Sequence, residues 1–374
     1  MSFFFILRLG RSERDFFFYT AERDDMRILL FCENRYAVDI LKPIGDAALR
    51  EGGHDVLWYV DGRKIGCFPL DGAVSWTGVM QEVYDWRPEA IFVPGNIVPY
   101  YLSGVKIQVF HGYASEKKGH WVIRRYFDTY FTQGPFFTRR FEELSRKYGD
   151  FEVLETGWSR RDWVHAHLRA FDGEREELLR RYGRKRIALY APTFSKRFTS
   201  LPYMKEVLRR LVTERKDWLL VVKLHPLTAR EWVEEYGELA RETDGIVLMD
   251  DYSVARYMLM ADVMLSDTSS TIYEFLLLDK PVITLRAGAK DVYWHDVQDV
   301  EDVPRVFDEV TRRDDLAERR RWVIENYDPY DDGMSSVRML EGAKDYIRRH
   351  GVPQCRKLNV WRKYMCIKTF GRVR

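Results

Sequence analysis

Short apolar segments alternate with longer amphipathic ones along most of the chain. Met26–Cys32 and Trp218–Leu224 are mainly hydrophobic over seven residues, a pattern typical of strands buried on both faces of a parallel sheet. Nine further segments have the same character: Asp55–Val60, Ala90–Val93, Val105–Phe110, Asp128–Thr132, Phe151–Thr156, Arg186–Tyr190, Ile246–Met249, Asp262–Leu265 and Pro281–Leu285. Helical periodicity between most of these segments predicts repeated strand–helix–strand units and therefore an α/β protein.

The predicted strands fall into two series, which indicates two doubly wound domains. A length of 374 residues agrees, because it fits two domains of about 150–200 residues each. A charged helical stretch between about Arg160 and Lys185 joins the series, so we predict an N-terminal domain over residues 26–165 and a C-terminal domain over residues 166–334. Residues 1–25 precede the first predicted strand, and we expect an appendage that contributes little to the core.

Composition excludes several classes of protein. Apolar residues make up 46% of the chain and charged residues 32%, which rules out a disordered chain or a disulfide scaffold. A formal net charge of +2 argues against a nucleic-acid partner. The four cysteines form no CxxC pair, and no apolar run approaches the roughly 18–20 residues of a membrane span. We therefore expect a cytoplasmic protein.

The near-neutral total hides a strongly basic C-terminal tail. Residues 356–374 hold seven basic residues and no acidic one, which leaves 53 of the 60 basic residues against 58 acidic ones elsewhere. Four hydrophobic side chains alternate with these cations: Trp361, Tyr364, Ile367 and Phe370. This pattern is typical of a helix on an anionic membrane surface, and a solvated tail is the alternative.

Small polar residues and histidines follow the predicted strands of both series. His111 comes after Val105–Phe110, Thr193 after Arg186–Tyr190, and His225 after Trp218–Leu224. Ligands of open parallel sheets bind beyond the carboxyl ends of the strands. The sequence therefore predicts a site to which both sheets contribute.

The clearest local signal is the hydroxyl-rich run that precedes the helix predicted at Thr271–Leu278. Asp267, Thr268, Ser269 and Ser270 lie where hydroxyls and free backbone N–H groups at a helix start can receive a phosphate. Glu274 lies one helical turn further on, where its carboxylate would accept a hydrogen bond from a ribose hydroxyl; a surface glutamate is the alternative. We predict a phosphate site here, in preference to plain helix capping.

Two histidines are candidates for the chemistry. His111 precedes Gly112, which allows a ligand to approach the backbone, and an imidazole that titrates near neutral pH suits a general base. His225 lies between Lys223 and Pro226, which adds a positive charge and a rigid backbone beside it. We predict that His111 is the base and that His225 binds a phosphate.

Known metal and nucleotide motifs are missing. The chain holds no GxGxxG, GxxxxGK[ST] or HExxH motif and no Asp-x-Asp triplet of the kind that binds a divalent metal in many sugar-nucleotide transferases. His120 follows a charged loop and is expected on the surface, and His165 and His167 do not share a helix face. These features favour metal-independent chemistry on a nucleotide diphosphate, without a cofactor.

Several segments resemble one enzyme family. They are RIALYAPT at residues 186–193, KLHP at 223–226, ADVMLSDTSSTIYEFLLLDKPVITL at 261–285, TGWSRRD at 156–162 and DGMSSVR at 332–338. In this order, over about residues 105–345, they resemble the CDP-glycerol glycerophosphotransferases of teichoic-acid and capsule synthesis. The long segment is the most specific of them.

The resemblance implies a GT-B fold, in which two Rossmann-like domains face a cleft and a C-terminal helix, here residues 335–355, crosses back. The N-terminal domain would bind the acceptor and the C-terminal domain the nucleotide donor. The implied reaction moves an alditol phosphate from a CDP-alditol to a hydroxyl of a polyprenyl-linked or glycan acceptor, at the inner face of the cell membrane. His111 would be the base and His225 a pyrophosphate ligand, with Ser269 and Ser270 on phosphate. Further phosphate contacts implied in this way are Arg160, Arg161, Ser335 and Ser336.

The sequence departs from the family pattern at two places. Tyr113-Ala114-Ser115-Glu116 stands where the family usually has Thr-Pro-Leu-Lys after its first His-Gly, which leaves the acceptor and the donor alditol open. Asp267-Thr268 replaces a common Asp-Tyr, a milder change. Two alternatives remain: a nucleotide-sugar enzyme of the same fold, either a glycosyltransferase or a UDP-sugar 2-epimerase, and a membrane-bound subunit that binds nucleotide without turnover.

Overall fold

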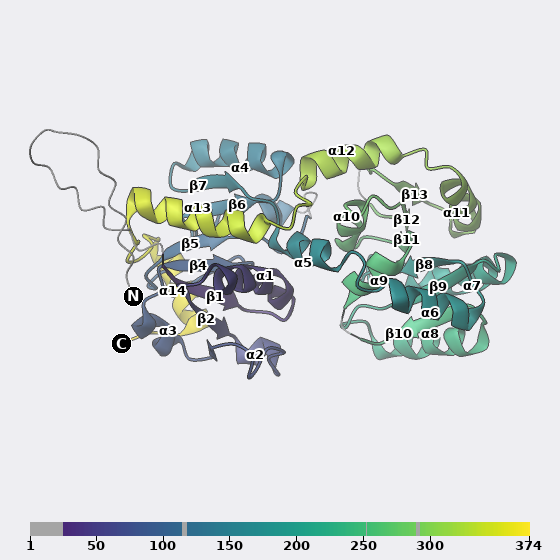
Figure 1. The fold of residues 1–374 in the computed structure, drawn as a ribbon, viewed down its shortest axis with the longest axis horizontal. Helices are drawn as coiled ribbons and strands as arrows, with labels where there is room; N and C mark the ends of the chain where they lie inside the picture. The colour runs from purple at the N-terminus through teal and green to yellow at the C-terminus, as the bar shows by residue number, and fades with distance from the viewer. Residues whose placement is uncertain (1–24, 114–117, 252, 289–291) are drawn as a thin grey trace, which may run out of the picture.

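The computed structural model describes residues 25–113, 118–251, 253–288 and 292–374 (Figure 1). Residues 1–24 of the expected N-terminal appendage lie outside this range. So do Ala114–Glu116, which follow the His111-Gly112 pair and Tyr113. The described chain forms two α/β domains that lie side by side along the long axis of the molecule.

The N-terminal sheet has seven parallel strands in the order β3-β2-β1-β4-β5-β6-β7. Its strands are β1 (Arg27–Cys32), β2 (Asp55–Val60), β3 (Trp76–Thr77), β4 (Ala90–Val93), β5 (Val105–Gln108), β6 (Thr129–Thr132) and β7 (Glu152–Glu155). The helices of this part of the chain are α1 (Tyr36–Glu51), α2 (Gly62–Ile65), α3 (Met80–Trp86), α4 (Pro135–Tyr148) and α5 (Ser159–His167).

The C-terminal sheet has six parallel strands in the order β10-β9-β8-β11-β12-β13. They are β8 (Arg186–Tyr190), β9 (Trp218–Lys223), β10 (Ile246–Met249), β11 (Val263–Ser266), β12 (Val282–Leu285) and β13 (His295–Val297). Its helices are α6 (Asp172–Tyr182), α7 (Leu201–Glu214), α8 (Arg230–Glu242), α9 (Val254–Met260), α10 (Thr271–Leu276), α11 (Val303–Arg312) and α12 (Ala317–Tyr327). The predicted α/β class with two doubly wound sheets is confirmed.

The strand order places a switch point in each sheet. In the N-terminal sheet the order reverses between β1 and β4, and in the C-terminal sheet it reverses between β8 and β11. Connections on the two sides of a switch point leave the sheet in opposite directions, so a crevice opens at the carboxyl ends of these strands. The fold thus provides two crevices in which loops from different strands meet.

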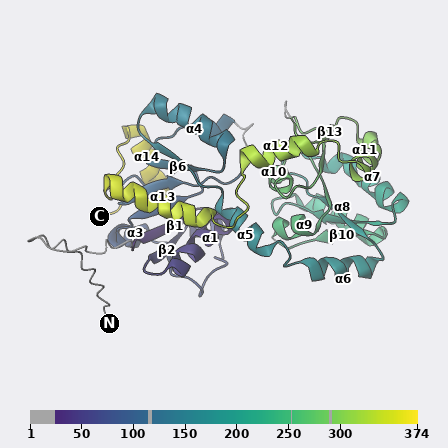
Figure 2. The same ribbon diagram turned by 45° about the horizontal axis from the view of Figure 1, so that its top comes forward.

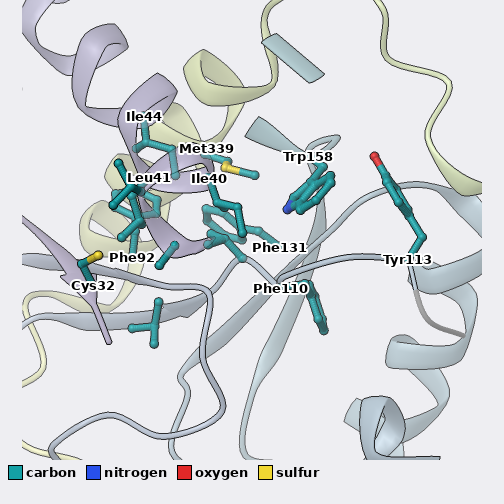
Figure 3. Close-up of a cluster of buried hydrophobic side chains, with 14 of the residues drawn as sticks. Cys32, Ile40, Leu41, Ile44, Phe92, Phe110, Tyr113, Phe131, Trp158 and Met339 are labelled. Atoms are coloured by element: carbon teal, nitrogen blue, oxygen red, sulfur yellow. The ribbon is translucent and has the colours of Figure 1, made fainter. Parts of the chain in front are cut away.

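The chain returns to the N-terminal domain after α12. Helix α13 (Ser335–His350) lies across that domain in both views (Figures 1 and 2). Its Met339 is fully buried in the core beside Ile40 and Leu41 of α1, together with Phe92 and Phe131 of the sheet (Figure 3). Gly342 allows the close approach, because a Cβ there would collide with Leu154 of β7.

The basic tail forms helix α14 (Val360–Phe370), which packs on the N-terminal domain. Phe370 meets Phe31 of β1 edge to face, with ring centroids 5.4 Å apart, and the Cys366 thiol donates to the Val98 carbonyl at 3.2 Å. Val98 lies in the β4–β5 connection, which contains no helix of its own. The alternative of a freely solvated tail is therefore wrong.

Among the described residues, no helix combines the length and the apolar character that crossing a membrane requires.

Candidate active site

A cavity of about 290 Å³ opens between the two domains at their switch points. Its lining comes from α1 and the segments after β5 and β7 in the N-terminal domain, and from the segments after β8, β9, β10 and β11 in the C-terminal domain. The predicted site residues in this lining are His111, Arg160, Lys223, His225, Ser269, Ser270 and Glu274. The structure thus brings both candidate histidines into one cavity from opposite domains.

The hydrogen bond of His111 determines which of its ring nitrogens carries the proton. Its Nδ1 lies 3.1 Å from the Pro94 carbonyl oxygen. A carbonyl oxygen only accepts hydrogen bonds, so the neutral ring is protonated at Nδ1 and its lone pair is on Nε2. The Tyr36 ring lies beside the imidazole at a centroid distance of 5.5 Å. His111 therefore has the tautomer that a general base working through Nε2 needs.

His225 has the opposite tautomer. The backbone N–H of Leu227 donates to its Nδ1 at 3.0 Å, so the proton of the neutral ring is on Nε2. Phe194 stacks on the imidazole at 4.4 Å between ring centroids and fixes its plane. Burial and the charge of Lys223 both lower the pKa of His225. His225 is thus a neutral hydrogen-bond donor, a role that suits a phosphate oxygen.

Two cations line the cavity. Lys223, the last residue of β9, is 5% exposed, and its Nζ donates to the Leu224 carbonyl at 3.0 Å. Burial lowers the pKa of Lys223 because the ammonium group loses its solvation. An anionic ligand beside the ammonium group would offset that cost. Arg160, at the start of α5, provides the second cation.

Arg160 also links the two domains. Its Nε lies 3.0 Å from a carboxylate oxygen of Glu274 in the C-terminal domain, and its Nη1 lies 3.7 Å from Asp39 of α1. Burial raises the pKa of Glu274, and the nearby guanidinium group of Arg160 opposes that shift. The carboxylate predicted to meet a ribose hydroxyl therefore lies in the cavity and holds an arginine there.

The serine pair lies at the start of α10. The Ser269 hydroxyl is 2.7 Å from the Thr271 hydroxyl, and both residues line the cavity with Ser270. Helix α10 has only six residues, so its dipole is weaker than that of a long helix. Phosphate binding here would depend on the serine hydroxyls more than on the helix dipole.

Three residues of the predicted donor site hold a loop together, and they are absent from the described lining of the cavity. The Asp267 carboxylate is fully buried and accepts hydrogen bonds from the backbone N–H groups of Thr193 and Thr268, at 2.8 and 2.6 Å, and from Ser200. It ties the segment after β11 to the segment after β8. These bonds give Asp267 a role in supporting the cavity wall, and direct donor contacts of Thr193, Asp267 and Thr268 stay a prediction.

The structure also separates Arg160 from the other expected phosphate contacts. Neighbouring helix residues point about 100° apart, so Arg161 faces away from this cavity and donates to the Leu277 carbonyl at 3.2 Å. Ser335 and Ser336 are buried at the start of α13, where their backbone N–H groups bind the Asp162 carboxylate at 2.9 and 2.7 Å. In this structure the Asp162 carboxylate binds the N–H groups at the start of α13, and phosphate contacts of Ser335 and Ser336 stay a prediction.

Sequence reasoning missed four residues near the cavity. Tyr36 and Asp39 of α1 line it, and their position after β1, at the switch point, is the signal that could have identified them. His120, expected on the surface, stacks on Phe110 at a centroid distance of 5.1 Å, and burial lowers its pKa to about 4. Glu33, directly after β1, is only 5% exposed.

Glu33 gives a prediction about pH. Burial raises its pKa from 4.5 to about 7, with Lys64 as an opposing cation 3.7 Å away. Between these pH values the folded state binds more protons than the unfolded state, so stability decreases as the pH rises through this window. We expect Glu33→Gln to reduce the loss of Tm between about pH 5 and pH 8 in calorimetric scans. Exposed Glu238→Gln is the control, and an equal pH dependence in wild type and Glu33→Gln would contradict the assignment.

Within the described part of the chain, no three His, Cys, Asp or Glu side chains gather closely enough to hold a metal ion. The polar groups of the residues that line the cavity are hydroxyls, two imidazoles, two cations and two carboxylates.

Comparison with solved structures shows the fold. A wall teichoic acid polymerase, TagF, aligns with a TM-score of 0.62 and 19% identity, covering 86% of this chain and 89% of the other. The UDP complex of MnaA from S. aureus aligns with a TM-score of 0.60 and 17% identity, covering 86% and 97%. The expected GT-B fold, with two Rossmann-like domains facing a cleft, is thereby confirmed.

Comparison of sequences shows the family. A teichoic acid glycerol-phosphate primase from Bacillus spizizenii is 38% identical over 102 residues, which are 26% of this chain and 25% of the relative. A teichoic acid ribitol-phosphate primase from the same organism is 23% identical over 215 residues, 51% of this chain and 54% of the relative. The chain thus aligns with only a quarter to about half of these relatives. A family model described as CDP-glycerol:poly(glycerophosphate) glycerophosphotransferase matches residues 103–342, and the chain belongs to this family.

Proposed function

We propose that the protein transfers glycerol phosphate, or a related alditol phosphate, from a CDP-alditol to an acceptor hydroxyl in the synthesis of a cell-envelope polymer. The observation that carries the proposal is the pair of histidines in one cavity, with a lone pair on Nε2 of His111 and an N–H on Nε2 of His225. One can take a proton and the other can donate a hydrogen bond to a phosphate. Membership of the family supports this choice of reaction.

In the proposed reaction the acceptor hydroxyl attacks the β-phosphorus of the donor. Nε2 of His111 takes the hydroxyl proton as the new oxygen–phosphorus bond forms. The bond from the β-phosphorus to the bridging oxygen breaks, and the electron pair leaves with CMP. A base in position contributes about 10²–10⁴-fold to such a reaction.

The leaving CMP gains negative charge, and the C-terminal domain supplies the groups that stabilise it. His225, Lys223, Ser269 and Ser270 line the cavity from the C-terminal domain. Arg160 would reach the phosphates by leaving its ion pair with Glu274, which in turn would free that carboxylate for the ribose. Groups already in position stabilise developing charge at little reorganisation cost.

A donor screen tests the proposal. The purified protein is incubated with CDP-glycerol, CDP-ribitol or UDP-N-acetylglucosamine together with a polyprenyl-linked glycan acceptor, and the release of CMP, UMP and UDP is followed. Release of CMP that requires the acceptor supports the proposal. Binding of CDP-glycerol without release of CMP would favour a nucleotide-binding subunit and contradict the transferase proposal.

A nucleotide-sugar enzyme is the second candidate. A solved UDP-N-acetylglucosamine 2-epimerase aligns with a TM-score of 0.61 and 15% identity over 87% of this chain, and Glu274 in the cavity suits a ribose in either class. A rise in Tm with UDP-linked compounds, and none with CDP-linked compounds, would favour this candidate.

We further propose that α14 holds the protein against the inner face of the cell membrane. The helix buries Cys366 and Phe370 against the domain. Trp361, Tyr364 and Lys368 lie on its outer side, where Trp361 is 67% exposed and Tyr364 is 51% exposed. Positions i, i+3 and i+7 share one helix face. Aromatic and lysine side chains on one exposed stripe suit the interface of an anionic bilayer. Such a location would bring the enzyme to a lipid-linked acceptor.

Point variants test this location without removing the helix, whose deletion would uncover Phe31 and Val98. We expect Trp361→Ala/Tyr364→Ala to lower co-sedimentation with phosphatidylglycerol vesicles, and Lys368→Gln to cost about 1 kcal/mol, roughly fivefold in binding. Tyr203→Ala removes an equally exposed aromatic side chain from the C-terminal domain and is the control. Unchanged vesicle binding by the double variant would refute the proposal.

A further inference from the structure

The backbone around His111 is strained. Phe110, the residue before it, has φ of +57°, a left-handed conformation that is rare for a bulky side chain, and Gly112 after it has φ of +152°. Such a residue costs on the order of 1–3 kcal/mol and persists only where the surroundings hold it. Something must therefore keep this turn, and with it the imidazole, in place.

Aromatic packing holds one side of the turn. Phe110 is 5% exposed, and its ring contacts His120, stacked at 5.1 Å, and Phe141, at 5.0 Å between centroids. This packing fixes the Phe110 side chain.

Two buried glutamines donate hydrogen bonds to backbone carbonyls near His111. Gln108, the last residue of β5, is 3% exposed, and its Nε2 donates to the Pro94 and Gly95 carbonyls at 3.2 and 2.6 Å. Gln133, the first residue after β6, is fully buried, and its Nε2 donates to the Gly112 carbonyl at 3.0 Å. Burying an amide N–H group is costly unless it is hydrogen-bonded, so these donated bonds constrain the backbone that they reach.

The Pro94 carbonyl oxygen is the point that joins Gln108 to the imidazole. It accepts hydrogen bonds from both Gln108 Nε2 and His111 Nδ1, which uses its two lone pairs. Gln108 thereby fixes the atom that keeps the His111 proton on Nδ1. Glu33 packs behind this segment, because a side chain at Gly95 would collide with its carboxylate.

We propose that Gln108 and Gln133 are positioning residues that form an amide brace around the His111 turn. Gln108 sets the tautomer and direction of the ring through the Pro94 carbonyl, and Gln133 holds the turn through the Gly112 carbonyl. The inference rests on the proposed function of His111 as the base, but the brace itself can be measured without any substrate.

The test uses Gln108→Met and Gln133→Met, which keep side-chain length and remove the amide. We expect either variant to lower the kcat for CMP release by about 10- to 100-fold, the usual scale for a misplaced catalytic group, with an unchanged dissociation constant for CDP-glycerol in calorimetry. In ¹⁵N-histidine NMR spectra without substrate, the wild-type signal of His111 should show the proton on Nδ1. Gln108→Met should shift that signal toward a mixture of tautomers.

Thr132→Val is the matched control. It removes a fully buried hydroxyl from the residue before Gln133, where it bonds Thr138 at 2.7 Å, away from the His111 turn. We expect it to lower Tm with no change in kcat or in the His111 signal. Wild-type kcat in folded Gln108→Met, or an unaltered tautomer, would overturn the proposal, as would loss of donor binding. If the wild type released no CMP from any donor, the proposed function would fail while the NMR result still decided the brace.

Discussion

We expect His111→Ala to release CMP from CDP-glycerol about 10²–10⁴-fold more slowly than the wild-type protein. The substitution removes the imidazole whose unprotonated nitrogen is Nε2, whereas the unprotonated nitrogen of His225 is Nδ1, which accepts a hydrogen bond from the Leu227 N–H. It leaves the C-terminal wall of the cavity intact, where Lys223, His225 and the serine pair lie. The dissociation constant for CDP-glycerol, measured by calorimetry, should therefore change little while kcat falls.

The control for this variant is His350→Ala, which removes an exposed histidine at the end of α13, outside the cavity. It should keep wild-type turnover. Two results would contradict the assignment of the base: near-wild-type kcat in a well-folded His111→Ala protein, or a loss of activity that only follows the loss of folded protein in thermal melts.

We expect His225→Ala to weaken donor binding as well as turnover. A hydrogen bond to a charged group contributes about 1.5–3 kcal/mol, which corresponds to about a 10- to 150-fold higher dissociation constant for CDP-glycerol. His225→Gln places an amide N–H within the same reach and should restore part of this affinity. Calorimetry with CDP-glycerol and with CMP measures both variants.

The pair of variants separates the two histidines. In the proposed mechanism His111→Ala changes kcat alone, whereas His225→Ala changes the dissociation constant and kcat together. Equal donor affinity in His225→Ala and the wild type would show that the imidazole does not meet the pyrophosphate. A loss of donor affinity in His111→Ala would show that His111 also contributes to donor binding, which would contradict a role confined to proton transfer.

The fold was predictable because its strands are apolar over most of their length. The segments at Asp55–Val60, Ala90–Val93, Arg186–Tyr190 and Ile246–Met249 form strands with the predicted bounds. β3 and β13 were missed, because two or three residues at the edge of a sheet are too few to show a period. Helix α14 was only partly predicted, because its sequence does not show that Cys366 and Phe370 pack on the domain while Trp361 and Tyr364 stay exposed.

The site residues that directly follow predicted strands could be located from the sequence. His111 and His225 follow strands at the carboxyl edges, so the parallel topology alone brings them to the cleft. The contacts that the sequence does not reveal join residues that are distant from one another along the chain. Asp267 binds Ser200, 67 residues away, and the N–H group of Ser335 binds Asp162, 173 residues away. No local pattern distinguishes such a carboxylate–backbone contact from one made to a ligand.

The position of α13 and α14 determines when the N-terminal domain can be completed during synthesis. Residues 335–370 add Met339, Cys366 and Phe370 to the packing of a domain whose seven strands all lie before residue 156. On the ribosome, the first domain to begin folding is therefore the last to finish, after the C-terminal domain between them has emerged. For the same reason residues 26–165 are not a unit that can be excised, whereas a circular permutation that joins α14 to β1 would make the N-terminal domain continuous.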